Sequence, residues 1–170
     1  MDRRALYDED YYAWLQQQAA ALRRLAQDRR DLPNDLDIAQ IAEEIEDVGK
    51  SELRATEGFI RNILIHVLLV AFDLDSSARR RWRLEIRTFH GGLRKFATAS
   101  MRQLVDMDEL WTDAVAMADA RLQEYVNRLP RTLPTRCPLS FDEIRDNNVD
   151  WDSVVEKLGS PNRDSGSESS

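Results

Sequence analysis

The sequence predicts an all-α protein: an up-and-down helical bundle of about four main helices, with a proline-rich C-terminal segment and a short terminal helix. Apolar residues recur every three or four positions over long stretches, which keeps them on one face of a helix. No stretch shows the sustained alternation of apolar and polar residues that a sheet requires. Short polar connectors separate the helical stretches, which favours antiparallel neighbours.

The first helix is expected from Asp8 or a neighbouring cap residue to about Gln27, because its apolar residues share one face. These residues are Tyr11, Trp14, Leu15, Leu22 and Leu25. Residues 31–34 then predict a turn, since Pro33 disfavours helix at the residue before it.

The second helix is expected from Asp35 or Asp37 to Asp73, and it is acidic in its first half and apolar in its second. Its stripe consists of Ile41, Ile45, Val48, Ala55, Phe59, Ile63, His66 and Val70. Gly49 costs only about 1 kcal/mol relative to alanine, so we expect the helix to continue through it.

A third helix is expected after the serines at 76 and 77, with Trp82, Ile86, Phe89, Leu93 and Phe96 on one face. Gly91 and Gly92 predict either a kink or a close backbone contact in this helix. A fourth helix is expected from about Asp106 to Arg128, followed by an extended segment containing Pro130, Pro134 and Pro138.

Ser140 and Glu143 have the spacing of a capping box, which predicts a short helix after Ser140. Trp151, Val154, Val155 and Leu158 predict a last apolar turn that docks on the bundle. We therefore expect one domain over residues 1–158 and a disordered tail over residues 159–170, where small polar residues dominate.

Composition limits the classes of partner. The chain has 170 residues, 42% of them hydrophobic, and a formal charge of -7, which argues against general affinity for nucleic acid or anionic membranes. The one cysteine, Cys137, allows no internal disulfide and indicates a reducing compartment, so cytoplasmic localisation is expected. The apolar run Ile63–Phe72 is about half the roughly 20 residues that a membrane-spanning helix needs, so no membrane partner is expected.

The first candidate site combines Glu43, Glu44 and Glu46 with His66, because carboxylates and histidines on bundle helices form metal sites. A metal-dependent hydrolase is the least favoured function, since neither histidine follows a glutamate at the Glu-x-x-His spacing. No metal, cofactor or catalytic residue is therefore predicted. His66 is expected to be a core histidine that hydrogen-bonds to a neighbour, and Cys137 to be an inert loop thiol.

The second candidate site is the basic run of the third helix. Glu52 lies on the buried stripe of the second helix, where a carboxylate needs a partner, and arginines between Arg79 and Lys95 are the expected partners. The same run, including Arg80, Arg81 and Arg83 around Trp82, is alternatively a phosphate or nucleic-acid surface. Trp82 is in register with the apolar face, which favours a place in the core.

Several segments in order resemble the bacterial family catalogued as domain of unknown function 29. They are residues 7–14 (YDEDYYAW), 41–52 (IAEEIEDVGKSE), 66–69 (HVLL), 80–87 (RRWRLEIR) and 137–141 (CPLSF). The resemblance spans Leu6 to Leu158 and departs from the family pattern after the histidine segment, where only Phe72 supplies an aromatic residue. It implies a small helical bacterial protein and brings no established activity.

The favoured function is a non-enzymatic protein-interaction or self-associating module, whose partner is another copy or another protein. This hypothesis depends on the amphipathic helices and on aromatic residues suited to interfaces. Those residues are Trp14, Trp111, Tyr125 and Trp151. The alternative is a nucleic-acid or phosphate-ligand module that uses the basic helix.

Overall fold

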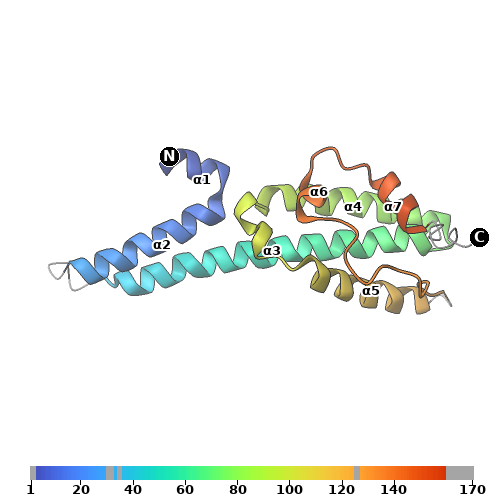
Figure 1. The fold of residues 1–170 in the computed structure, drawn as a ribbon, viewed down its shortest axis with the longest axis horizontal. Coiled ribbons are helices and arrows are strands. Elements are labelled where there is room, and N and C mark those ends of the chain that lie inside the picture. Colours follow the sequence, from blue (N-terminus) through green and yellow to red (C-terminus); the bar gives the residue numbers. More distant parts are fainter. Residues whose placement is uncertain (1–2, 30–32, 34–35, 125–126, 160–170) are drawn as a thin grey trace, which may run out of the picture. The chain divides into compact units, whose positions relative to one another are not determined.

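The computed structural model describes residues 3–29, 33, 36–124 and 127–159, and within these ranges it contains helices and no strand (Figure 1). The predicted all-α class is therefore confirmed. The elements in chain order are α1 (Arg3–Glu9), α2 (Tyr11–Asp28), α3 (Ile38–Phe72), α4 (Ser76–Phe96), the 3₁₀ helix η1 (Ala99–Gln103), α5 (Met107–Gln123), α6 (Phe141–Arg145) and α7 (Trp151–Gly159).

The chain forms two compact units. The first unit comprises Met1–Glu57 and Phe96–Val105, and the second comprises Gly58–Lys95 and Asp106–Ser170. The long helix α3 contributes its acidic half to the first unit and its apolar half to the second. The expected tail lies outside the described residues except for Gly159, which ends α7.

The N-terminal stretch contains two helices where the sequence predicts one. Asp10 has φ -146° and ψ 81°, so it breaks the helix, and its side chain caps α2 by accepting a hydrogen bond from the Ala13 amide. The same carboxylate accepts hydrogen bonds from the amide and the hydroxyl of Ser100, at 2.9 and 2.7 Å. This non-local contact, which sequence spacing does not reveal, joins the start of α2 to η1.

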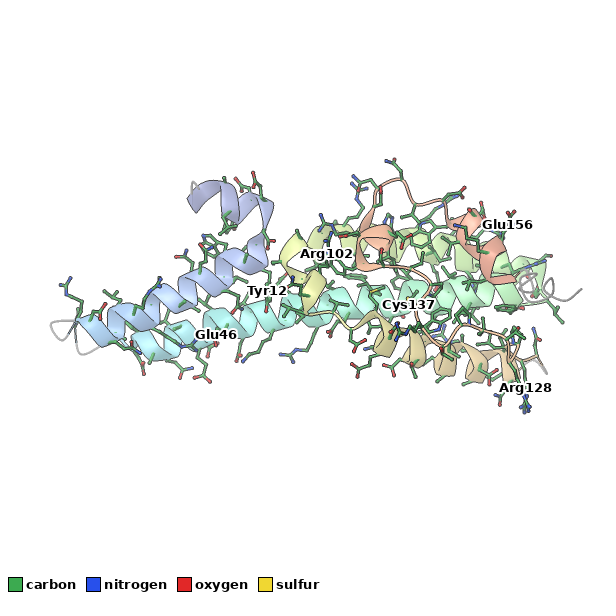
Figure 2. All side chains as sticks on the ribbon, in the orientation of Figure 1. Tyr12, Glu46, Arg102, Arg128, Cys137 and Glu156 are labelled. Carbon is green, nitrogen blue, oxygen red and sulfur yellow. The ribbon has the colours of Figure 1, made fainter. Side chains whose placement is uncertain are left out.

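Small residues allow α2 to lie close against α3 in the first unit. Ala19 and Ala42 are fully buried, and a Cβ atom added at Gly49 would lie 3.0 Å from the Gln16 side chain. The predicted continuity of α3 through Gly49 is confirmed. Figure 2 labels Tyr12 on α2 and Glu46 on α3, and Glu46 pairs with Arg23 farther along α2.

The core of the second unit forms around the apolar half of α3. Its fully buried members include Ile60, Ile63, Leu64, Val67 and Leu68 from α3, Ile86 and Leu93 from α4, Trp111 from α5 and Ile144 from α6. The α4 helix continues through both glycines, and Gly92 marks a close contact, because an added Cβ would lie 2.4 Å from Phe59 Cε1.

The C-terminal part of the second unit follows the predicted order with one difference in length. The predicted start near Asp106 is confirmed, with the Asp106 side chain as the cap of α5, but the helix ends at Gln123 and not near Arg128. Asn127 then donates its side-chain amide to the carbonyl of Phe72, 2.6 Å away, which draws the chain toward the end of α3. Ser140 and Glu143 form the predicted capping box at the start of α6.

The length and composition of α3 would by themselves allow it to cross a membrane, and 56% of its most apolar window is buried within the structure. A core helix of a soluble protein has the same properties, so this observation is weak evidence for a membrane span.

Candidate functional site

His66 lies at the centre of a polar and aromatic cluster in the second unit. Its side chain is 2% exposed, and its Nδ1 atom donates a hydrogen bond to the carbonyl of Asn62, one turn earlier in α3, at 2.6 Å. Its Nε2 atom lies 2.8 Å from Oε2 of Glu85 on α4. The rings of Trp82 and Phe89 lie 5.2 Å from the imidazole between centroids. The predicted core histidine with a hydrogen-bonded neighbour is confirmed.

The charge state of His66 is set by opposing influences. Burial lowers the pKa of His66 below its ordinary value and outweighs the Asn62 carbonyl and the Glu85 carboxylate, which both favour the imidazolium. The nearby Arg121 adds to the lowering of this pKa. Because Nδ1 already carries a proton, the short contact between Nε2 and Glu85 is favourable when one further proton lies between those two atoms.

Trp82 connects this cluster with a pocket at the turn between α3 and α4. The indole N–H donates a hydrogen bond to Oδ2 of Asp73 at 3.2 Å, and the Arg81 guanidinium carbon lies 4.3 Å from the indole centroid. The pocket measures about 450 Å³, and we name it the turn pocket. It is lined by Asp73, Leu74, Asp75, Ser77, Ala78, Arg81, Trp82 and Asn127.

The structure therefore brings together part of the predicted set. His66, Trp82 and Arg81 form a continuous series of contacts. Arg83 instead donates to Asp152 of α7 at 3.0 Å, and Arg80 is exposed. The contributions of Asp73 and Asn127 were missed, because Asn127 reaches the turn only through the folded C-terminal segment. Asp73 could have been found from the sequence, because it lies in the predicted turn only nine residues before Trp82.

The acidic residues of the predicted set belong to the first unit. Glu46 forms a two-pronged ion pair with Arg23, Glu44 accepts a hydrogen bond from Gln40 at 3.0 Å, and Glu43 is exposed. Among the described residues, no three His, Cys, Asp or Glu side chains gather in a way that could hold a metal ion. His66 belongs to the second unit, so neither compact unit contains the combined set.

Glu52 is half-buried in the first unit, and burial raises its pKa above the ordinary value. Burial is the largest cause of the raised pKa of Tyr11, and the charges of Tyr7 and then Glu52 add to it. The arginines at 79–94 belong to the second unit, so neither unit contains both members of the expected ion pair with Glu52. The sequence correctly indicated that the Glu52 carboxylate is partly buried, but it did not identify Tyr11 as a residue near it.

Two surfaces stand out by composition. The first, which we name the α3 stripe, consists of Ile41, Ile45, Val48, Glu52 and Ala55. Ile41 is 39% and Val48 42% exposed, although the next residues around the helix, Ala42 and Gly49, are buried against α2. The steps of four and three residues in this stripe are those of a coiled-coil seam.

The second surface is the basic face of α4. This helix carries seven cationic side chains against the single carboxylate of Glu85. One exposed arc surrounds Leu84, which is 59% exposed. The cations of this arc are Arg80, Arg83, Arg87, Arg94 and Lys95. Arg80, Arg87 and Lys95 have no ion pair within the described part of the chain.

The predicted interface aromatics have different environments. Trp111 is 1% exposed and its indole donates to the carbonyl of Pro134 at 2.8 Å, so its predicted interface role is wrong. Trp14 lies with Tyr7 and Tyr11 in a half-exposed cluster, and Trp151 packs edge-on to His90. Tyr125 lies outside the described residues. Burial raises the pKa of Cys137 to about 11, which is the property of an inert thiol.

Comparison with known proteins supports the same fold. A model of the family described as "Domain of unknown function DUF29" matches residues 6–151. An α-helical protein of unknown function from Rhodospirillum rubrum, solved by crystallography, is 39% identical and superposes with a TM-score of 0.86. The match covers 91% of this chain and 98% of the other. No curated protein matches the chain.

Proposed function

This chain belongs to the DUF29 family, and from that premise we propose that it is a non-enzymatic, cytoplasmic interaction protein that pairs with a second copy of itself through the α3 stripe. The observation that carries this proposal is the exposure of Ile41 and Val48 on a helix whose adjacent face is already covered by α2. An apolar seam at heptad spacing is the usual surface on which another helix packs.

The stripe is long enough for a helix of a second copy to pack along it. It runs over about 21 Å of helix at 1.5 Å per residue, which is nearly four turns.

The test is the mass of the full chain in solution, measured by analytical ultracentrifugation over a dilution series. We expect a dimer that dissociates in the Ile41→Glu, Val48→Glu double variant. The matched control is Leu84→Glu, since Leu84 is an exposed apolar residue of α4 outside the stripe. A wild-type chain that stays monomeric at its highest soluble concentration would refute the proposal.

Circular dichroism at each dilution verifies that the helix content is retained in every variant.

The basic face of α4 favours a second candidate function, the binding of nucleic acid or another phosphate ligand. The specific observation is a set of exposed cations without a carboxylate partner along one face of a helix. Such binding should weaken steeply as salt is raised, because phosphate contacts release counterions. The Arg80→Ala, Arg87→Ala double variant should reduce affinity for a single-stranded oligonucleotide and flatten its salt dependence. Affinity that is independent of salt would refute this candidate.

A further inference from the structure

The turn pocket contains the groups that recognise a guanidinium ion. The pocket is lined by the indole of Trp82 and by two acidic residues, Asp73 and Asp75, of which Asp73 accepts a hydrogen bond from the indole N–H. A cation is attracted to an aromatic face by the ring quadrupole and to carboxylates by charge and directional hydrogen bonds. Leu74, which is 84% exposed, supplies an apolar edge for the stem of such a ligand.

The carboxylates are held in place by the turn itself. Asp73 accepts hydrogen bonds from the Asp75 amide at 3.0 Å and from the Trp82 indole. Asp75 accepts from the amide and the hydroxyl of Ser77, both at 2.8 Å. These hydrogen bonds from Ser77 hold the pKa of Asp75 below its usual range, and the charge of Arg81 contributes to the same shift. Each carboxylate has about four acceptor positions, so capacity remains for a ligand.

The pocket already holds one cation from its own chain. The guanidinium of Arg81 lies over the Trp82 ring at 4.3 Å and acts electrostatically on Asp75. Arg81 is nevertheless an exposed residue on the first turns of α4, and none of the hydrogen bonds or ion pairs described for this region ties its guanidinium to a carboxylate. A side chain held in this way can leave the ring at little cost, and an external cation of the same chemistry can replace it.

We infer that the turn pocket binds a small molecule that carries a guanidinium group, which displaces the Arg81 side chain from Trp82 and is held by Asp73 and Asp75. Arg81 is then an intramolecular competitor: it occupies the ring in the free protein and swings into solvent when the ligand enters. Because a tethered group competes at a high effective concentration, its removal strengthens binding of the external ligand.

The test uses the full chain labelled with ¹⁵N and titrated with agmatine, followed through the indole N–H resonance of Trp82, which the Trp82→Phe variant assigns. We expect a saturable shift of this resonance, whereas those of Trp14, Trp111 and Trp151 stay in place. Methylguanidine should compete with agmatine, and methylurea, which has nearly the same shape without the charge, should not. Equal binding of methylurea, or a shift caused by inorganic phosphate in place of agmatine, would overturn the inference.

Variants separate the ligand site from general effects on the fold. Arg81→Ala should bind agmatine about tenfold more tightly than the wild type, since the tethered competitor is gone. Arg80→Ala is the matched control, because it removes a neighbouring arginine that does not line the pocket, and its affinity should be unchanged. Asp75→Asn should bind at least about fivefold more weakly, as expected for loss of a charged hydrogen-bond acceptor. If Arg81→Ala loses helix content, Arg81→Gln replaces it; absence of saturable binding in both the wild type and the folded Arg81 variant would refute the proposal.

Discussion

The Nε2 atom of His66 and the Oε2 atom of Glu85 lie 2.8 Å apart, which joins the most buried titratable group of α3 to a half-exposed carboxylate on α4. The other imidazole nitrogen is held by the Asn62 carbonyl, so the ring has one orientation. The buried imidazole therefore contacts a carboxylate that is partly exposed to solvent. Because burial lowers the pKa of His66, the stability of the second unit depends on the protonation of this imidazole.

The first prediction concerns pH. Burial lowers the pKa of His66 in the folded protein below 6.5, so the unfolded chain takes up a proton at a higher pH than the folded chain does. Stability is therefore complete above the unfolded pKa and falls as the pH drops from about 7 toward the folded pKa. Urea unfolding between about pH 7.5 and about pH 5 should show a decreasing midpoint.

Two variants assign this pH dependence. His66→Gln should cost about 1–3 kcal/mol at neutral pH, because it disturbs a buried polar contact, and should flatten the decrease in the midpoint. His90→Gln is the comparison, since burial also lowers the pKa of His90 and that imidazole lies against Trp151. An unchanged slope in both variants would mean that other groups cause the pH dependence.

The second prediction contrasts two adjacent glycines of α4. Gly92→Ala should destabilise the protein by about 1–3 kcal/mol, because the new methyl group would overlap the Phe59 ring. Gly91→Ala should stabilise it by up to about 1 kcal/mol, since nothing lies within 4 Å and alanine is the better helix former. Thermal unfolding followed by circular dichroism measures both. Equal effects at the two positions would contradict the close contact of Phe59 with Gly92.

The third prediction concerns the hydrogen bonds that the Asp10 carboxylate accepts from Ala13 and Ser100. Asp10→Ala should cost about 2–3 kcal/mol, because it removes both the α2 cap and two hydrogen bonds from Ser100. Burial acts to raise the pKa of Asp10, but the hydrogen bonds from Ala13 and Ser100 outweigh it and hold this pKa below 3.8. The contribution is thus present above about pH 4 and is lost as the pH falls through the folded pKa. Asp8→Ala, an exposed neighbour in α1, should leave the urea midpoint nearly unchanged.

The fourth prediction concerns the thiol of Cys137. A pKa raised from 9.0 to about 11 reduces the thiolate fraction near pH 8 about 100-fold, so native Cys137 should react with iodoacetamide about 100-fold more slowly than in the urea-unfolded chain. Mass spectrometry of timed samples gives both rates. A native rate close to the unfolded rate would show that the thiol is neither buried nor held near the Asp108 carboxylate.

Local patterns predicted most of the helices. The periodicity of α3, the start of α5 near Asp106, the capping box at Ser140 and the interruption by the prolines depend on residues within a few positions of one another. The cap at Asp10 agrees with the predicted start at Asp8 or a neighbouring residue. The hydrogen bonds that Ser100 donates to the same carboxylate could not be predicted in this way, because Ser100 lies 90 residues later.

The candidate sites likewise have some features that local sequence predicts and others that depend on tertiary packing. By itself the sequence determined the all-α class, the core position of His66 and the basic character of α4, since each follows from helical spacing and charge. Only the tertiary structure decided that Glu85 is the neighbour of His66, that Arg81 covers Trp82, and that Ile41 and Val48 stay exposed beside a covered face. These relationships depend on which helix faces pack together, and residues on different helices are brought within a few ångströms by packing that their own local spacing does not encode.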